Sequence, residues 1–149
     1  MPHDNAAAVE RLARYLGITL SFNGDGVCEL IIDGDASITL EGDPHGTSLR
    51  VNGAVGHLPD PHEPEALRLL LQANFNGQGT GDASLGLDHV SDAVVLGRTV
   101  RMDELGHDGL APVLEAFANE FAHWREHLPR LIRDAGTVRN PSPASILRG

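Results

Sequence analysis

The chain has 149 residues, the size of a single domain with a core of its own. Its formal net charge is −10, from 21 acidic residues against 11 arginines with no lysine, and such a surface repels nucleic-acid backbones. The apolar runs are too short to span a membrane, the N-terminus lacks a secretory signal pattern, and the lone Cys28 excludes an intrachain disulfide, so we expect a globular protein of a reducing cytoplasm.

A helix is expected first, capped by Asp4 or Asn5 and ended by Gly17. Its apolar positions recur at helical spacing: Val9, Leu12, Ala13 and Leu16. From Ile18 onward apolar and polar residues alternate, and turn-forming Gly, Asn and Asp residues interrupt the alternation, which predicts an antiparallel meander with one solvated face. The expected strands are 18–22, 27–33, 36–41 and 48–52.

A second helix follows the rigid connection at residues 58–61, with Pro64 in its first turn. Leu67, Leu70 and Leu71 lie on one side of this helix at 100° per residue. Ala66, Leu69 and Ala73 widen the apolar arc to roughly 200°, about twice what one core-facing stripe requires. Such a helix needs two partners, and we expect them to be its own sheet and a second copy of the chain.

After the second helix, the glycine-rich residues 76–84 predict a mobile loop, and alternating residues around 85–87 and 94–100 predict two strands that join the meander in one sheet. Asp108 is a candidate cap for a last helix with Pro112 in its first turn. Apolar residues of this helix are spaced 4, 3, 4, 3, 4, as in a long helix laid along a sheet: Leu110, Leu114, Phe117, Phe121, Trp124 and Leu128. Composition then divides the chain into a domain, 1–134, and a disordered tail, 135–149.

Few residues point to catalysis. His123 and His127 frame the only metal-like motif, H-x-x-E-H, in which both rings share a helical face. The apolar residues around them favour a packing helix, and no third ligand stands at a recognisable spacing. The segment from Asp33 to Pro44 lacks the glycine and the glutamate that a calcium loop requires. The glycines of residues 77–81 are not followed by a helix whose N-terminus could bind phosphate. Cys28 alternates with core residues, so we expect an inert core thiol. We therefore expect no catalytic residue, metal or other cofactor.

Taken in order, helix, three strands, helix, two strands, helix, the chain resembles the class I type III secretion chaperones of the Tir chaperone (CesT) family. The segment that carries this resemblance best is the leucine-rich helix ending in Ala73-Asn74, followed at this distance by Leu-Gly-Leu-Asp at 85–88. Further matching stretches are Leu12–Gly17, Leu20–Asp33, Val94–Leu96 and Phe121–Arg125.

The resemblance implies an α+β fold, with a twisted antiparallel sheet and its helices packed mainly on one side, in a homodimer. It implies a bacterial cytoplasmic chaperone without enzymatic activity. Such a chaperone binds the N-terminal segment of a secreted effector in extended form, and the secretion ATPase is a further candidate partner. Candidate effector-binding residues between the first helix and the sheet are Val9, Leu12, Leu20, Phe22 and Leu30. Candidate dimer residues are Ala66, Leu69, Leu70, Ala73, Leu85 and Leu87.

Two other functions compete with this interpretation. The first is a dimeric regulator or adaptor that binds a folded partner instead of an extended segment. The second, weaker one is a metal-dependent hydrolase that uses His123 and His127.

Overall fold

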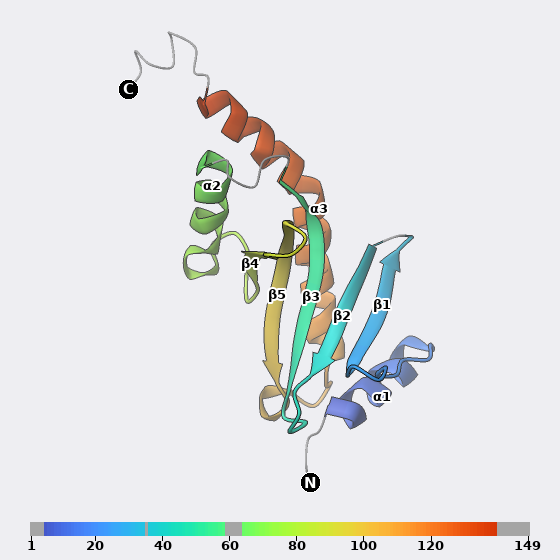
Figure 1. Ribbon diagram of the computed structural model, residues 1–149. Coiled ribbons are helices and arrows are strands. Elements are labelled where there is room, and N and C mark those ends of the chain that lie inside the picture. Colours follow the sequence, from blue (N-terminus) through green and yellow to red (C-terminus); the bar gives the residue numbers. More distant parts are fainter. Residues whose placement is uncertain (1–4, 35, 59–63, 140–149) are drawn as a thin grey trace.

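The computed structural model describes residues 5–34, 36–58 and 64–139, which form one antiparallel sheet and three α-helices (Figure 1). The helices are α1 (Asn5–Leu16), α2 (Pro64–Asn74) and α3 (Ala111–Arg139). The strands are β1 (Val27–Asp33), β2 (Ala36–Gly42), β3 (Ser48–His57), β4 (Ser84–Leu87) and β5 (Ala93–Arg101). Two single turns of 3-10 helix, η1 (Phe75–Gly77) and η2 (Met102–Glu104), complete the order.

The sheet has the strand order β1-β2-β3-β5-β4, so the meander and the later strand pair share one sheet as predicted. β5 pairs with β3 on one side and with β4 on the other, which leaves β1 and β4 as the two outer strands. The predicted fold class, α+β with this order of elements, is confirmed.

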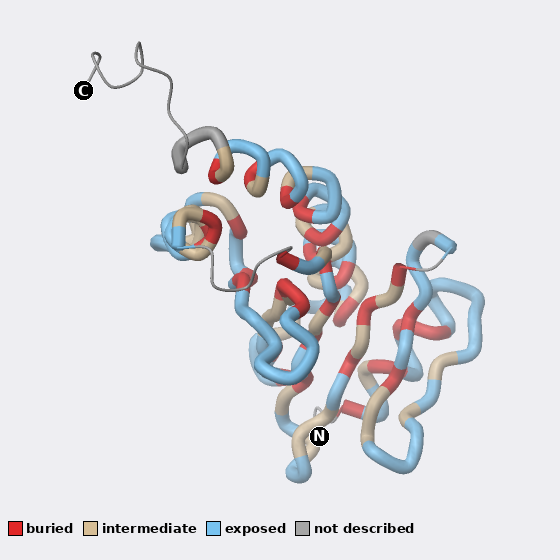
Figure 2. Tube along the Cα trace, turned by 45° about the horizontal axis from the view of Figure 1, so that its top comes forward, coloured by how far each residue is buried: buried red, intermediate tan, exposed pale blue. Residues whose placement is uncertain are grey.

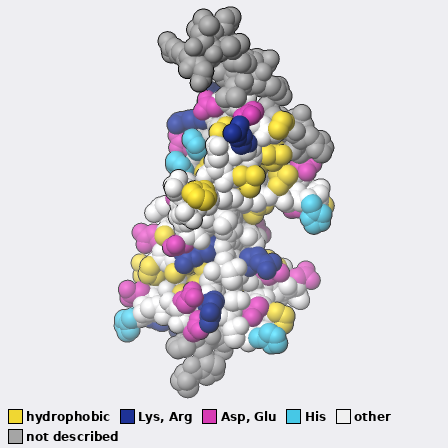
Figure 3. Space-filling view, turned by 90° about the vertical axis from the view of Figure 1, so that its left-hand side faces the viewer, with side chains coloured by type: hydrophobic (Ala, Val, Ile, Leu, Met, Phe, Trp, Pro, Cys, Tyr) yellow, Lys and Arg dark blue, Asp and Glu magenta, His cyan; other side chains and the backbone are white. Residues whose placement is uncertain are grey.

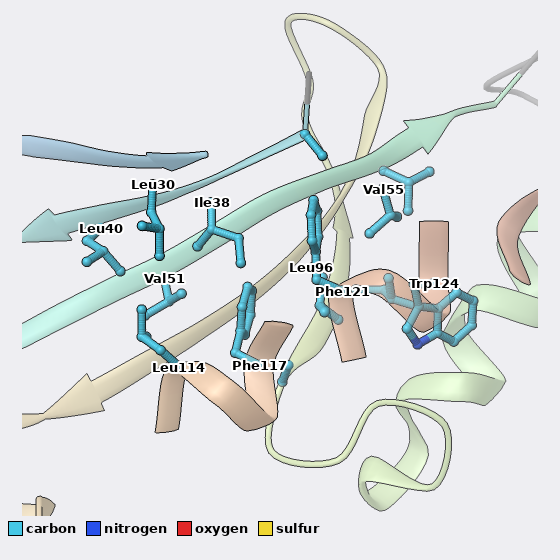
Figure 4. Close-up of a cluster of buried hydrophobic side chains, with 14 of the residues drawn as sticks. Leu30, Ile38, Leu40, Val51, Val55, Leu96, Leu114, Phe117, Phe121 and Trp124 are labelled. Atoms are coloured by element: carbon cyan, nitrogen blue, oxygen red, sulfur yellow. The ribbon is translucent and has the colours of Figure 1, made fainter. Parts of the chain in front are cut away.

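The core lies between the sheet and α3, which crosses one face of it diagonally (Figure 1). The predicted seam of α3 is buried along its full length, from Leu110 to Leu128. The rings of Phe117 and Phe121 lie toward the strands, and Trp124 lies toward the segment after α2 (Figure 4). The opposite side of α3 is exposed (Figure 2). At the far end of the sheet, Val9 and Leu12 of α1 join the same core beside Cys28 and Leu30 of β1.

Two glycines of β3 let α3 approach the strand closely. A Cβ at Gly53 would lie 2.6 Å from Cε1 of Phe121, and one at Gly56 would lie 2.8 Å from Cδ2 of Leu128. Both distances are shorter than van der Waals contact, so only glycine fits at these positions.

The predicted strand at residues 18–22 is wrong. These residues run as an irregular segment between α1 and β1, with Ile18 exposed and Leu20 and Phe22 half-buried against the core. Alternation is only a local preference, whereas a strand needs a neighbour for its hydrogen bonds. Instead, the turn at Asn23 fixes the segment: its amide N–H donates to Val27 O at 2.8 Å.

The predicted ends of the last helix also need correction. Asp108 is no cap, because α3 begins at Ala111 and the amide N–H of Leu114 donates to Leu110 O at 2.9 Å. Pro112 lies in the first turn as predicted. The helix continues five residues beyond Asp134 to Arg139, and Ala135 is fully buried, so part of the expected tail belongs to the fold. Residues 140–149 and the candidate cap Asp4 lie outside the described residues.

The glycine-rich segment 76–84 is packed against α3, which corrects the prediction of a mobile loop. Thr80 is fully buried, and Nε1 of Trp124 donates to Gly79 O at 2.9 Å. The glycines serve the tight turns that this packing requires, since Gly77 has a φ of 70° and Gly81 a φ of 64°.

Candidate functional site

Exposed apolar side chains gather at two opposite ends of the molecule. We call the first group the α2 surface, which consists of Leu71, Phe75, Leu87 and Val90. Leu71 and Phe75 stand one helical turn apart and are 70% and 64% exposed. Figure 3 shows hydrophobic side chains concentrated over the part of this face where α2 and β4 lie. An apolar patch of this kind marks an interaction site on a globular protein.

The second group lies at the other end of the sheet, and we call it the α1–β1 surface. It consists of Tyr15, Leu16, Ile18, Ile31 and Ile32. Tyr15 is 73% exposed at the end of α1, and Ile31 is 66% exposed on β1, where it pairs with Ser37 of β2. Tyr15, Leu16 and Ile18 come from the end of α1 and the turn after it, and Ile31 and Ile32 come from the end of the outer strand β1.

The two outer strands of the sheet differ in what their edges offer. The β4 edge is occupied at Leu85, because the Asn74 side chain donates to Leu85 O at 2.8 Å and accepts from Leu85 N–H at 2.7 Å. The side-chain amide of Asn74 thus makes the two hydrogen bonds that a neighbouring strand would make with Leu85. On β1, both outer-edge bonds found within the described residues are at Val27, whose O accepts from Asn23 N–H at 2.8 Å and whose N–H donates to Asn23 Oδ1 at 3.1 Å. The edge of β1 beyond Val27 is therefore open to a further strand.

The predicted dimer residues lie mostly in the chain's own core. Ala66, Leu70 and Leu85 are buried, Leu69 and Ala73 are half-buried, and only Leu87 is exposed. Two members of the α2 surface, Leu71 and Phe75, were not singled out for this role. The sequence signal was the excess width of the apolar arc, which indicated a second partner without indicating which flank of the helix meets it.

The predicted effector-binding residues lie beneath the α1–β1 surface and not on it. Three of them are buried between α1 and the sheet: Val9, Leu12 and Leu30. The other two, Leu20 and Phe22, are half-buried. Regular alternation with Cys28 and Leu30 would put Ile32 on the inner face of β1. A shift of register between Ile31 and Asp33 turns this end of β1 outward and leaves Ile32 39% exposed.

A shallow groove of about 930 Å³ runs over the solvated face of the sheet, opposite the core. Polar and small residues from β2, β3, β5 and β4 line it, among them Ser37, Asn52, Gly97 and Gly86. Arg98 and Asp82 stand at its β4 end and form an ion pair with Nη1 and Oδ2 3.7 Å apart. The groove therefore offers main-chain groups, small polar side chains and charged ones, among them Arg50 and Asp88.

The histidine motif of α3 is a packing feature in this structure. The rings of His123 and His127 stack with centroids 5.3 Å apart, and His127 packs edge-on against the buried Trp124. Within residues 5–34, 36–58 and 64–139, no group of three or more His, Cys, Asp or Glu side chains is placed to hold a metal ion. The hydrolase alternative therefore has no third ligand in the described part of the chain.

Two acidic side chains stabilise turns near these surfaces. Desolvation would raise the pKa of Asp43, but hydrogen bonds from Ser48, Thr47 and Asn5 outweigh it and lower the pKa to about 2. Asp88, in the turn after β4, accepts from the Val90 amide N–H at 2.9 Å, and this bond lowers its pKa. Both carboxylates are structural, since all the bonds that lower their pKa values come from their own turns except the one from Asn5 of α1 to Asp43. No helix among the described residues is long and apolar enough to cross a membrane.

The model of the Tir chaperone protein (CesT) family matches residues 7–125. A search of curated proteins gives no match. Among solved structures, the chain is similar to one from the ExsC–ExsE complex, with a TM-score of 0.67 at 21% identity over 84% of this chain and 96% of that chain. It is also similar to one from the HopA1–SchA chaperone–effector complex, with a TM-score of 0.64 at 22% identity over 82% of this chain and 90% of the other.

A further similar structure comes from a complex of the Yersinia pestis type III secretion chaperone SycH with a stable fragment of YscM2. Its TM-score is 0.62 at 20% identity, over 80% of this chain and 98% of that one. At this identity the likeness establishes the fold alone.

Proposed function

Because this chain belongs to the Tir chaperone protein (CesT) family, we propose that it is a type III secretion chaperone that binds the N-terminal segment of a secreted effector in extended form. The observation that carries the proposal is the outer edge of β1, which is open beyond Val27 and ends at the exposed Ile31 and Ile32. Solved relatives named as chaperone–effector complexes support the same conclusion.

Binding would proceed by strand addition to the β1 edge. Each main-chain hydrogen bond contributes a net ~0.5–1.5 kcal/mol, and apolar side chains of the segment bury the α1–β1 surface, including Tyr15 and Ile31. Ordering an unstructured segment costs about 2–5 kcal/mol or more, so a short contact at one edge is insufficient. The segment must therefore cover more of the protein, and the groove on the solvated face of the sheet offers a continuation lined by polar groups.

We further propose that two copies of the chain associate through the α2 surface. Leu71 and Phe75 offer an apolar face that the chain's own core leaves uncovered, and Leu87 and Val90 add to it from β4 and the turn that follows. A two-fold dimer buries the same patch on both subunits, which suits a self-complementary apolar face. The β1 edges, at the opposite end of each sheet, would then remain accessible for the effector.

In this account the protein catalyses no reaction, acts in the bacterial cytoplasm, and holds its partner in a form that is competent for export. The acidic surface, with a net charge of −10, repels other acidic molecules and keeps the complex dispersed. We propose that the protein also contacts the secretion ATPase.

The proposal is tested at Ile31. The effector is first identified by mass spectrometry of whatever copurifies from the native cell, and its N-terminal segment is then produced with the chaperone. Ile31→Glu should weaken binding of the segment at least about tenfold, because it removes an exposed apolar contact and adds a charge at the open edge. Ala122→Glu, which adds the same charge at an exposed residue of α3 outside the α1–β1 surface and the groove, should leave binding within about twofold. Equal affinities for the two variants would refute binding at β1.

A dimeric regulator that binds a folded partner would give another result. Hydrogen exchange on the purified complex separates the two functions, since an extended segment has protection only where it contacts the chaperone. Protection throughout the partner, equal to that of the partner alone, would favour the regulator.

A further inference from the structure

The outer edge of β1 presents its main-chain groups at fixed positions (Figure 1). Val27 makes its two outer bonds with Asn23, so the N–H and the C=O of Val27 point away from β2. The ladder between β1 and β2 is regular from Val27 to Ile31. Main-chain groups of alternate strand residues point to the same side, so those of Glu29 and Ile31 also point outward. A strand that pairs with this edge therefore bonds to Glu29 and Ile31.

The side chains of these two residues lie on the outer face of the sheet, away from the core. Glu29 is exposed and Ile31 is 66% exposed, whereas the alternate residues Cys28 and Leu30 are buried in the core. In β2, Thr39 stands directly opposite Glu29. The outer face at this edge thus offers a carboxylate and an apolar side chain that are two positions apart.

The carboxylate of Glu29 lacks a cation of the chain's own. Among the residues that the structure describes, its side chain makes no hydrogen bond or ion pair. Arg50 of β3 stands directly opposite another acid of the outer face, Glu41. Asp25, in the turn before β1, adds a further exposed acid at this end of the strand. The edge of β1 is therefore negative toward a strand that approaches it.

A strand added to this edge places one side chain opposite Glu29 and, two positions away, another opposite Ile31. This spacing holds for either direction of the added strand. Opposite charges in a directly opposed pair stabilise a sheet, like charges destabilise it, and apolar side chains favour one another. We infer that the partner's strand carries a lysine or arginine opposite Glu29 and an apolar residue opposite Ile31. This inference rests on the proposed function, because it specifies the segment that pairs with β1.

The test uses the full chain and the N-terminal segment of the copurified effector, with affinities measured by calorimetry at about 0.05 M salt. Glu29→Lys should weaken binding at least about threefold, because it replaces an attraction by a repulsion in a directly opposed pair. Raising the salt to about 0.5 M should reduce this effect. The matched control is Glu126→Lys, which makes the same change of charge at an exposed residue of α3 outside the groove. The control should bind within about twofold of the wild type.

A charge swap identifies the residue that stands opposite Glu29. Each lysine or arginine of the segment is replaced by glutamate in turn. One of these segment variants should bind the wild-type chain at least about threefold more weakly, and its affinity for Glu29→Lys should return to within about twofold of the wild-type pair. An apolar residue should lie two positions from the basic residue identified in this way.

The inference is overturned if Glu29→Lys binds like Glu126→Lys, if no swapped segment restores binding, or if the segment contains no basic residue. It is also overturned if Glu29→Lys self-associates and still binds the segment normally, which would make Glu29 a charge that keeps two β1 edges apart. Each of these outcomes is compatible with weakened binding in Ile31→Glu, so the inference can fail while the proposed function stands. Equal binding by Ile31→Glu and Ala122→Glu would instead contradict both.

Discussion

The Asn74 side chain closes the β4 edge at Leu85. One isosteric substitution tests how much these bonds contribute to the free energy of unfolding. In Asn74→Asp the new side chain can still accept from the Leu85 amide N–H, now at 2.7 Å from Asn74 Oδ1. It cannot donate to Leu85 O, which lies 2.8 Å from Asn74 Nδ2, because a carboxylate at pH 7 carries no hydrogen. One hydrogen bond is lost, and two oxygen atoms face each other in its place.

The magnitude follows from the burial of this contact. Asn74 is half-buried and Leu85 is buried, so the carbonyl that loses its donor is only partly hydrated. An unsatisfied group of this kind costs about 1–3 kcal/mol of the free energy of unfolding. For a domain of this size, each 1 kcal/mol lowers the melting temperature by about 2–4 °C. We expect Asn74→Asp to melt at least about 2 °C below the wild type.

The assay is urea unfolding at pH 7 together with amide hydrogen exchange. Asn76→Asp is the matched control, since it adds the same charge two residues away at an exposed position whose φ of 52° aspartate tolerates. The control should stay within about 0.5 kcal/mol of the wild type. Asn74→Ala, which removes both bonds, should also make the Leu85 amide exchange faster. Equal unfolding midpoints for Asn74→Asp and Asn76→Asp, or an unchanged Leu85 exchange rate in Asn74→Ala, would refute the closure of this edge by Asn74.

Gly53→Ala should destabilise the fold by about 1–3 kcal/mol in urea unfolding, because its Cβ would overlap the buried ring of Phe121. Gly86→Ala, which has open space around it, should not destabilise the fold. Equal unfolding midpoints for the two variants would contradict the close packing of β3 and α3. Asp43→Asn should lower the melting temperature near pH 6, because the lowered pKa of Asp43 stabilises the fold at pH values above the unfolded-state pKa. The difference from the wild type should vanish as the pH falls from about 4 to about 2. A difference that is constant with pH would contradict this. Leu71→Asp should convert the proposed dimer to folded monomer in light scattering, while Gln72→Asp on the exposed polar side of α2 should not; an intact dimer in Leu71→Asp would place the interface elsewhere.

Much of the fold could be predicted because periodicity reports directly on burial. The spacing from Leu110 to Leu128 identified the buried seam of α3, and the alternation in β1, β2 and β3 identified the meander. The errors came where a local pattern depends on a distant contact. Residues 18–22 alternate like a strand but have no neighbouring strand, and residues 76–84 are rich in glycine but are anchored by Trp124, 45 residues from Gly79.

The exposed apolar surfaces were harder to predict than the core. Sequence periodicity ranks residues by how apolar they are, so it selected Val9, Leu12 and Leu70, which the protein uses for its own core. The apolar residues that stay exposed, such as Tyr15, Leu71 and Phe75, follow the same helical patterns but lie at the ends or on the far flank of their helices. The state of the two sheet edges could not be predicted, because it depends on the side-chain bonds of Asn74 to Leu85.

The central claim, that an extended partner segment adds to the β1 edge, is tested most directly by amide hydrogen exchange on the chaperone with and without its bound segment. The account predicts that amides within residues 29–33 become protected in the complex, that those of β4 do not change, and that the bound segment has no protection outside its contact. Unchanged exchange over 29–33 in a saturated complex would contradict it.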